Sequence, residues 1–201
     1  MLIAVEGNIG AGKSTFLRRL EDLGAKVVYE PVDEWMSLRD ASRDKSLLEL
    51  FYEDKARYGF AFQMMILETR FASLSSVDPG ELVFCERSLL TDLEVFANLM
   101  HRSGGMTDVE HAVYSRYQRL LLRLGGVEVG AIVYLRVTPA ECVNRIRRRD
   151  RQGEASIDEA YVTAVHEAHE TWLTDPALGT RVHTFDTDGD VDARAVLALF
   201  T

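Results

Sequence analysis

The chain has 201 residues, 47% of them hydrophobic and 27% charged, and no run of about 18 apolar residues, so we expect a soluble protein that spans no membrane. Its net charge of −9 argues against polymeric nucleic acid as a partner. Two cysteines are too few for a disulfide framework, and a strand that begins at Leu2 leaves no room for a signal peptide, so we expect a cytoplasmic location.

Short apolar runs alternate along the chain with longer stretches of helical periodicity. We expect strands at Leu2–Glu6, Lys26–Tyr29, Leu82–Cys85, Ala131–Arg136 and Val182–Phe185. We expect helices near residues 13–23, 46–76, 89–103, 108–124, 139–151, 157–173 and 190–200. This alternation predicts an α/β fold with a parallel five-stranded sheet flanked by helices, and such sheets bind ligands beyond the carboxyl ends of their strands. No repeat or linker interrupts the pattern, so residues 1–201 are expected to form a single domain.

A glycine-rich segment separates the first expected strand from the first expected helix. It runs Gly7-Asn8-Ile9-Gly10-Ala11-Gly12-Lys13-Ser14, followed by Thr15, and matches the P-loop pattern G-x-x-x-x-G-K-[ST]. Backbone N–H groups of such a loop wrap phosphate oxygens at the positive end of the helix dipole. We therefore expect residues 7–15 to bind ATP or another nucleoside triphosphate, with Lys13 at the β- and γ-phosphates and the Ser14 hydroxyl on Mg²⁺.

The second expected strand ends in the segment Glu30-Pro31-Val32-Asp33-Glu34-Trp35. A carboxylate at this strand tip lies near the position of the γ-phosphate and can accept the proton of an attacking hydroxyl, so Glu30 is the candidate general base. Trp35 has two open interpretations, as a wall of an apolar pocket or as a residue of the core.

The third expected strand is followed by Glu86, at a position where P-loop proteins carry a second acidic residue. Glu86 is therefore expected to hold the metal ion together with Ser14. Arg87 follows directly, and its planar guanidinium can donate two parallel hydrogen bonds to a phosphate or a carboxylate. An exposed Glu–Arg pair at a strand end is the alternative.

Five arginines crowd into one short segment: Arg145, Arg147, Arg148, Arg149 and Arg151. We interpret residues from about 145 to 156 as an arginine-rich lid, which folds over the transferring phosphoryl group, neutralises its charge and excludes water. A solvated helix face is the alternative. A nucleic-acid-binding patch is disfavoured, because the cluster lacks an extended basic stripe and interleaved aromatic residues.

These segments together resemble the deoxyribonucleoside kinase family, which includes deoxycytidine, deoxyguanosine and deoxyadenosine kinases. The motifs G-N-I-G-A-G-K-S-T, E-P-V-x-x-W, E-R-S and R-I-R-x-R-x-R follow in family order between Ile3 and about Asp190. The resemblance implies a kinase that transfers the γ-phosphate of ATP or another nucleoside triphosphate to the 5′-hydroxyl of a deoxyribonucleoside. It also implies a homodimer formed through two long helices, which we expect at 46–76 and 89–103.

The same resemblance implies roles for single residues. Glu30 is similar to the family's base, and Arg87 to the residue that binds the acceptor beside it. For the nucleoside, the resemblance implies contacts of Tyr52 and Glu154 with the sugar 3′-hydroxyl, of Gln63 with the base edge, and of Trp35 and Phe96 as aromatic walls. For the donor, it implies that the lid arginines Arg145, Arg149 and Arg151 bind the phosphates.

Two further positions, Arg70 and Asp92, bear on the choice of base. Deoxycytidine and purine kinases of the family carry an arginine and an aspartate there, whereas thymidine-accepting members carry smaller or apolar residues that leave room for the 5-methyl group. The resemblance therefore implies deoxycytidine or purine deoxyribonucleosides as substrates, unless Arg70 and Asp92 are unrelated surface residues. Two departures concern the same pocket: Gly153 stands where cellular members usually have glutamate, and Ile66 is bulkier than expected for a deoxycytidine kinase.

Three other functions remain open: a thymidine-preferring member of the family, a thymidylate-type nucleotide kinase, and a non-catalytic nucleotide-binding subunit. A nucleotide kinase phosphorylates a phosphate, so it needs cationic groups at the acceptor rather than the base expected at Glu30. A subunit without catalysis would not need its full set of candidate catalytic residues, which here are Lys13, Ser14, Glu30, Glu86 and Arg87.

Overall fold

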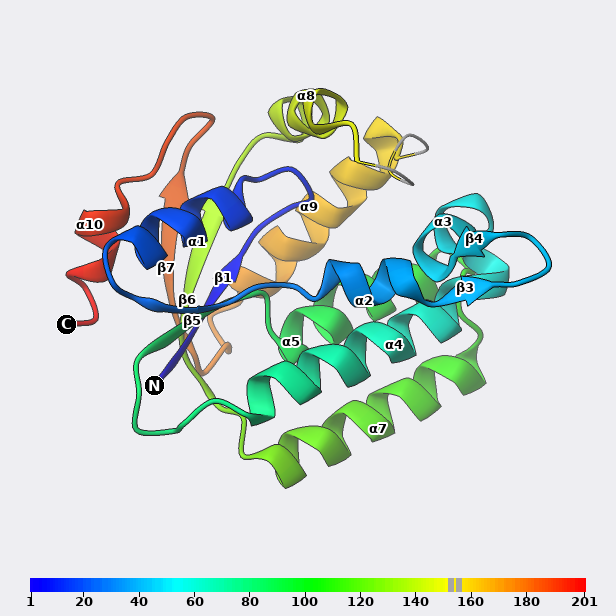
Figure 1. The fold of residues 1–201 in the computed structure, drawn as a ribbon, viewed down its shortest axis with the longest axis horizontal. Helices are drawn as coiled ribbons and strands as arrows, with labels where there is room; N and C mark the ends of the chain where they lie inside the picture. The colour runs from blue at the N-terminus through cyan, green and yellow to red at the C-terminus, as the bar shows by residue number, and fades with distance from the viewer. Residues whose placement is uncertain (152–153, 155–156) are drawn as a thin grey trace.

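A five-stranded parallel sheet forms the centre of the computed structural model, which describes residues 1–151, 154 and 157–201 (Figure 1). Its strands are β1 (Leu2–Glu6), β2 (Lys26–Val28), β5 (Val83–Glu86), β6 (Val129–Arg136) and β7 (Arg181–Asp186), in the order β2-β5-β1-β6-β7. All neighbouring strands run parallel. The predicted α/β fold and its sheet are confirmed, and the strands differ from their expected ranges only at their ends.

Helices surround this sheet. They are α1 (Lys13–Asp22), α2 (Val32–Ser37), α3 (Leu47–Glu53), α4 (Lys55–Ser75), α5 (Leu89–Thr91), the π-helical segment η1 (Asp92–Ala97), α6 (Asn98–Arg102), α7 (Asp108–Gly125), α8 (Pro139–Arg149), α9 (Glu159–Leu173) and α10 (Ala193–Leu197). A small antiparallel hairpin, β3 (Arg39–Asp40) with β4 (Lys45–Ser46), lies against α2 and α3. None of the helices in the described ranges is long and apolar enough to cross a membrane.

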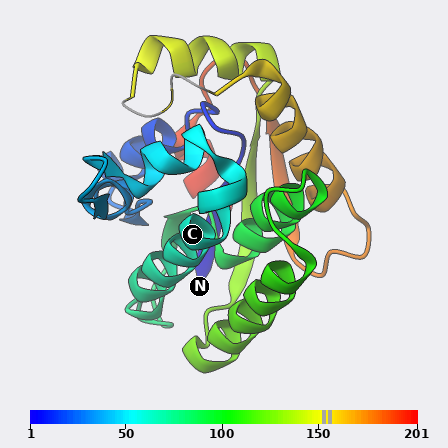
Figure 2. The same ribbon diagram turned by 90° about the vertical axis from the view of Figure 1, so that its right-hand side faces the viewer.

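Side chains of β1 alternate between two hydrophobic clusters, because successive residues of a strand point to opposite faces of its sheet. Ile3 and Val5 pack with apolar residues of α1 and α10. Leu2 and Ala4 belong to the larger cluster, which is formed with α3, α4, α7 and α9. Figure 2, seen at a right angle to Figure 1, shows how these helices enclose the sheet. Both faces are therefore covered, as the continuous apolar strands predict.

The single helix expected at 46–76 is wrong, because the chain forms two helices with Asp54 between α3 and α4. Asp54 has φ −145° and ψ 85°, and its carboxylate accepts a hydrogen bond from the backbone N–H of Arg57 at 3.0 Å. An aspartate at this position caps a new helix by satisfying an N–H group that has no partner within it. The cap therefore interrupts an apolar pattern that continues through it.

The helix expected at 89–103 is confirmed, since α5, η1 and α6 follow one another without a break from Leu89 to Arg102, but its middle part is π-helical. The π-helical turn of η1 is wider than an α-helical turn, and such turns within helices are frequent at functional sites. Here η1 carries two predicted site residues, Asp92 and Phe96. The sequence pattern predicted neither this turn nor α2 nor the β3–β4 hairpin.

Candidate active site

A cavity of about 490 Å³ opens where β1, β2 and β5 end. The predicted site residues that line it together are Lys13, Ser14, Glu30, Trp35, Tyr52, Gln63, Arg70, Glu86, Arg87, Asp92, Phe96, Arg149, Arg151 and Glu154, with Ile9 and Gly10 of the loop. A neighbouring cavity of about 480 Å³ is lined by four further predicted residues of the loop and the lid: Ala11, Gly12, Thr15 and Arg145. Gly7 and Asn8 line neither cavity.

The glycine-rich loop, which is predicted to bind phosphate, lies between β1 and α1, as expected. Gly10 has φ +80°, and a Cβ there would lie 2.5 Å from the carbonyl oxygen of Cys142, so this turn requires glycine. Asn8 belongs to this loop and its side chain is buried. Its Nδ2 donates to the Val162 carbonyl oxygen at 2.9 Å, and its Oδ1 accepts from the Ile9 N–H at 2.8 Å. Asn8 therefore ties the loop to α9.

The Lys13 side chain folds back onto this loop. Its Nζ donates to the carbonyl oxygens of Asn8 at 2.9 Å and Gly7 at 3.2 Å. Burial, together with the nearby positive charge of Arg87, lowers the pKa of Lys13 to about 8. At neutral pH the ammonium group is therefore charged but poorly solvated, so a phosphate at the loop would interact with it strongly.

Ser14 and Glu86 are in direct contact. The Ser14 hydroxyl donates to Oε1 of Glu86 at 2.9 Å, and both side chains line the larger cavity. A hydroxyl and a carboxylate are oxygen ligands of the kind that Mg²⁺ prefers, so this donor set fits a magnesium ion. No group of three or more His, Cys, Asp or Glu side chains in the described ranges could hold a metal. Water and phosphate oxygens would therefore complete the coordination.

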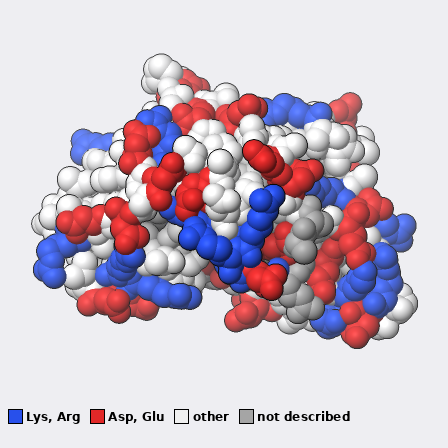
Figure 3. Space-filling model, turned by 90° about the horizontal axis from the view of Figure 1, so that it is seen from above, with Lys and Arg blue, Asp and Glu red and all other residues white. Residues whose placement is uncertain are grey.

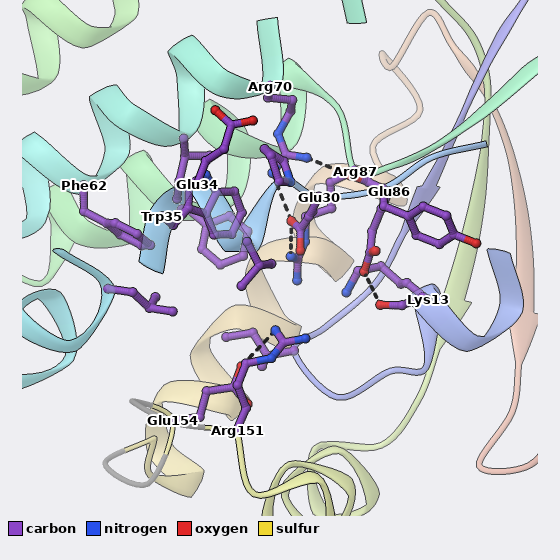
Figure 4. A pocket seen from close by; sticks show the side chains of 18 of the residues that line it. Lys13, Glu30, Glu34, Trp35, Phe62, Arg70, Glu86, Arg87, Arg151 and Glu154 are labelled. Atoms are coloured by element: carbon purple, nitrogen blue, oxygen red, sulfur yellow. Dashed lines mark hydrogen bonds and ion pairs between the residues drawn. The ribbon is translucent and has the colours of Figure 1, made fainter. Parts of the chain in front are cut away.

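Two arginines hold the Glu30 carboxylate by the same oxygen (Figure 4). Arg87 Nη1 donates to Oε1 at 2.6 Å, and Arg70 Nη2 donates to it at 2.9 Å. Among the described residues, no hydrogen-bond donor contacts Oε2. Burial alone would raise the pKa of Glu30, but the charges of Arg87, Arg70 and Lys13 outweigh burial and hold this pKa well below its ordinary value. Glu30 is therefore ionised, with one oxygen open to a proton.

Arg70 connects the predicted base with the predicted specificity residue. Its Nε donates to both carboxylate oxygens of Asp92, at 2.9 and 3.2 Å, and its Nη1 donates to the Glu86 carbonyl oxygen at 2.7 Å. Arg70 is 3% exposed and Asp92 is 1% exposed, so the interpretation of the two as surface residues is wrong. The sequence predicted only a position for Arg70 in the base pocket. The structure adds a contact between Arg70 and the predicted base, Glu30.

Trp35 satisfies both of its open interpretations, because it is buried in the core and also lines the cavity. Its Nε1 donates to the Thr69 hydroxyl at 3.0 Å, and its ring meets the ring of Phe62 edge-on. Gln63 is 1% exposed, and its Oε1 has no hydrogen-bond partner in the described part of the chain. A buried amide oxygen without a partner can accept a hydrogen bond from a ligand in the cavity.

Tyr52, Tyr161 and Phe96 belong to the aromatic lining of the cavity. The guanidinium carbon of Arg87 lies 4.9 Å from the ring centre of Phe96, which is a cation–π contact. Tyr52 and Tyr161 line the same cavity, and burial raises the pKa of Tyr161 to about 12. Sequence reasoning missed Tyr161 and Phe62, because their helical spacing also fits ordinary packing faces and no polar group sets them apart.

Two of the lid arginines share one carboxylate. Arg149 Nη2 donates to the two oxygens of Glu154 at 2.6 and 2.8 Å, and Arg151 Nη1 contacts Glu154 at 3.4 Å. In Figure 4, Arg151 and Glu154 lie across the cavity from Glu30. The residues expected at the sugar and at the phosphates therefore form one ion-pair cluster. Gly153, the departure noted in the sequence, lies outside the described residues.

Arg145 lies apart from this cluster, in the neighbouring cavity. Its guanidinium nitrogens donate to Oε1 of Glu141 at 2.8 Å, to the Ala11 carbonyl oxygen at 3.2 Å and to the Asp188 carbonyl oxygen at 2.6 Å. Arg145 thus joins α8, the phosphate loop and the loop after β7. Figure 3, which views this side of the molecule, shows basic side chains gathered across its centre among scattered acidic ones.

Comparison with known proteins agrees with this geometry. A family model described as deoxynucleoside kinase matches residues 3–196. Deoxycytidine kinase 2 of Gallus gallus is 32% identical over 198 residues, which cover 88% of this chain and 75% of that protein. Deoxycytidine kinase of Mus musculus is 33% identical over 201 residues, with 89% and 77% covered. Mitochondrial thymidine kinase 2 of Homo sapiens is 33% identical over 178 residues, with 88% and 66% covered.

The match includes all five strands of the sheet except Leu2, and every predicted site residue. It agrees with the P-loop that follows the central strand of a parallel sheet. The resemblance seen in the sequence is thereby confirmed. The chain belongs to the deoxynucleoside kinase family, whose members are ATP-dependent phosphotransferases.

Proposed function

We propose that this kinase transfers the γ-phosphate of ATP or another nucleoside triphosphate to the 5′-hydroxyl of deoxycytidine or a purine deoxyribonucleoside. The observation that carries this choice of base is the buried Arg70–Asp92 pair in the cavity wall. Such a pair fills space that a thymine methyl group would need and presents charged donors to a polar base edge. The relatives do not decide the base, since deoxycytidine kinase and thymidine kinase 2 match at the same identity.

In this proposal the 5′-hydroxyl lies at Oε2 of Glu30 and gives up its proton to that oxygen as its own oxygen bonds to the γ-phosphorus. The bond from the γ-phosphorus to the β,γ-bridging oxygen breaks, and the nucleoside diphosphate leaves. Arg87 and Arg70 keep the carboxylate oriented through Oε1. A carboxylate at this point would repel an acceptor phosphate, which disfavours the thymidylate-type alternative. The proposed acceptor is therefore a neutral hydroxyl.

The remaining cavity residues take the rest of the nucleoside. Tyr52 and Glu154 are proposed to contact the sugar 3′-hydroxyl, and the unpartnered Oε1 of Gln63 supports its role at the base edge. Trp35 and Phe96 form aromatic walls. Ile66 also lines the cavity, where its bulk narrows the base pocket.

The donor is proposed to lie on the other side of the transferring phosphoryl group. The N–H groups of the loop and Lys13 hold its phosphates, and Arg149 and Arg151 neutralise the charge of the group in transfer. Mg²⁺, held by Ser14 and Glu86, would supply positive charge to the phosphate oxygens. The neighbouring cavity, which Arg145 lines beside the loop, offers space for the base of the donor.

A substrate panel tests this proposal. Purified protein with Mg-ATP is incubated with deoxycytidine, deoxyadenosine, deoxyguanosine, thymidine or thymidine monophosphate, and the products are separated by chromatography. We expect monophosphates from deoxycytidine or the purine nucleosides at higher kcat/KM than from thymidine. A preference for thymidine would overturn the proposed base, a diphosphate product would support a nucleotide kinase, and no product would support a non-catalytic subunit.

Replacing Arg70 with methionine and Asp92 with alanine together should shift preference toward thymidine. The double change removes both charges, so neither is left buried alone, and it opens space for the methyl group. We expect the ratio of kcat/KM for thymidine to that for deoxycytidine to rise about tenfold, or roughly 1.4 kcal/mol in differential transition-state binding. Asp92→Ala alone should be the poorer enzyme, because it removes one of the two carboxylates, Asp92 and Glu30, that pair with the buried Arg70 guanidinium.

The ratio is the correct measurement, because Arg70 also contacts Glu30 and its loss should lower kcat for every nucleoside. This common loss cancels between substrates. The matched control removes an exposed pair in the β3–β4 hairpin, Arg39→Met with Asp44→Ala, and should leave the ratio unchanged. A double variant that kept the parental ranking would contradict the role given to Arg70 and Asp92.

We also propose that the kinase is a homodimer that associates through α7. Large apolar side chains are exposed along this helix at spacings of three and four, which place them on one face: Val109, Val113, Tyr117, Leu120 and Leu124. Such a patch typically marks an interface. Of the two segments expected at the interface, neither 46–76 nor 89–103 has an exposed large hydrophobic residue in the described structure. The exposed stripe therefore favours α7, which lies beside α4 (Figure 1).

Placing arginine at both Val113 and Leu124 should separate the subunits. We expect light scattering to give twice the chain mass of 22.7 kDa for the parent and a single chain mass for this variant. Two charges in an apolar interface would be desolvated without partners. Arg119→Glu, on the same helix but outside the stripe, is the control and should remain dimeric. A parent of single chain mass would sink the proposal.

A further inference from the structure

Glu6, the last residue of β1, is a buried acid that the proposed chemistry does not use. Its side chain is fully buried, and its Oε1 accepts hydrogen bonds from the hydroxyl of Ser88, at 3.1 Å, and from the hydroxyl of Thr91. Its Oε2 has no hydrogen-bond partner within the described ranges. A carboxyl group buried at this cost is expected to have a specific task.

The segment that Glu6 holds is strained. Arg87 has φ +63°, in the left-handed region that residues with a Cβ seldom adopt. Such a conformation persists only where the surrounding structure holds it in place, and it is concentrated at functional sites. Ser88 and Thr91, the two residues bound by Glu6, form the capping pair that begins α5 directly after this strained residue.

Three consecutive residues at the end of β1 hold the strained turn. The carbonyl oxygen of Val5 accepts from the backbone N–H of Arg87 at 3.0 Å, and the carbonyl oxygen of Gly7 accepts from Arg87 Nη2 at 3.3 Å. Glu6, between them, holds Ser88. The guanidinium that results from this arrangement lies 2.6 Å from Glu30 and over the ring of Phe96. The same end of β1 continues into the phosphate loop, so Arg87 is fixed relative to the donor phosphates.

We propose that Glu6 is a positioning residue for phosphoryl transfer, which holds Ser88 and Thr91 so that the strained backbone of Arg87 directs its guanidinium onto Glu30. This inference rests on the functions proposed above for Arg87 and Glu30. Glu6 itself touches neither of those side chains by a hydrogen bond, and its effect passes through the turn at residues 87–91.

The hydrogen bonds of Glu6, rather than its charge, carry this role. Burial raises the pKa of Glu6, against the opposing effects of the Thr91 hydrogen bond and of the charges on Arg87 and Arg70. Lys13 and Cys85 are the other titratable groups that interact with it. Oε1 accepts from both hydroxyls whether the carboxyl group is ionised or neutral. An amide has the same acceptor, so glutamine should replace Glu6 where alanine cannot.

The test compares Glu6→Ala with Glu6→Gln by steady-state kinetics and thermal unfolding. We expect Glu6→Ala to lower kcat about 10- to 100-fold with little change in KM for ATP, because the acceptor groups are misplaced. Glu6→Gln should recover most of that loss. If Glu6→Ala does not fold, Ser88→Ala and Thr91→Val remove the same hydrogen bonds from the other side and should lower kcat alike.

The matched control is Gln118→Met. Gln118 Nε2 donates to the Leu89 carbonyl oxygen at 2.7 Å, so it holds the backbone of α5 but donates no hydrogen bond to Arg87, Ser88 or Thr91. This change should lower the melting temperature and leave kcat near that of the parent. Glu30→Gln is assayed in parallel: if it keeps full activity, the proposed chemistry fails. If Glu30→Gln loses activity while Glu6→Ala keeps kcat within about threefold, or if Glu6→Gln is as slow as Glu6→Ala, only the positioning role is overturned.

Discussion

Replacing Lys13 with alanine is expected to lower phosphoryl transfer below detection, a loss of about 10³-fold or more. The ammonium group of Lys13 lies at the glycine-rich loop. Alanine removes its charge and its two hydrogen bonds to carbonyl oxygens of the loop. The fold should survive, because burial already disfavours the charged lysine, as its lowered pKa indicates. Mg-ATP should therefore raise the melting temperature of the parent and not that of Lys13→Ala.

A surface lysine provides the control for this change. Lys26 on β2 pairs with Glu81 at the exposed edge of the sheet, away from the cavity, so Lys26→Ala should keep both activity and the thermal shift with Mg-ATP. Ser14→Ala should also abolish transfer, with the effect concentrated on the dependence on Mg²⁺. Full activity in Lys13→Ala would contradict the assignment of residues 7–15 as the donor site.

Contiguous parts of this molecule were predictable from the sequence. The strand β1, the glycine-rich loop and α1 follow one another within a few residues, and each has a strong local signal. The central strands are continuous apolar runs because both faces of the sheet are covered by helices, so their pattern was clear as well. Because the carboxyl ends of parallel strands lie at one edge of the sheet, the motifs that follow these strands could be expected to lie close together.

A break between two helices and a π-helical turn within one could not be predicted from the same patterns. The apolar periodicity of 46–76 continues through Asp54, and only the side-chain cap on Arg57 shows that a new helix begins there. The π-helical turn at 92–97 has no sequence signal of its own, although it positions Asp92 and Phe96 for the cavity. Both features depend on local backbone and side-chain geometry, which the apolar pattern does not specify.

The least predictable part of the site is how its charges pair. The sequence positions of Glu30, Arg70 and Arg87 predicted that they lie at one site. They could not show that both arginines donate to the same oxygen, Oε1 of Glu30. The sequence also could not show that Glu154 pairs with Arg149. These contacts depend on rotamers and on distances between separate elements, which residue order does not encode.

Replacing Glu30 with glutamine should lower kcat about 10²- to 10⁴-fold with little change in the KM for the nucleoside. Glutamine keeps an oxygen that can accept from Arg87 and Arg70, but it puts an NH₂ group where the second carboxylate oxygen is proposed to accept the proton. The control is Glu34→Gln, a change of the same kind on α2 in a side chain that also lines the cavity and contacts neither arginine by an ion pair. It should stay near the parent, and turnover of Glu30→Gln within about threefold of the parent would exclude Glu30 as the base.

The pH dependence of stability separates the ion pairs of Glu30 from its proposed role as a base. Because the arginines hold the pKa of Glu30 below its ordinary value of 4.5, its ionised form stabilises the folded protein above that value, and this stabilisation is lost as the pH falls below it. Glu30→Gln lacks this contribution and leaves two buried guanidinium groups without their shared charge. Its melting temperature should therefore be lower than that of the parent at neutral pH, and the difference should narrow below pH 4.5. A constant difference at all pH values would mean that the arginines do not stabilise an ionised Glu30, and the open oxygen assigned to the 5′-hydroxyl would lose its physical basis.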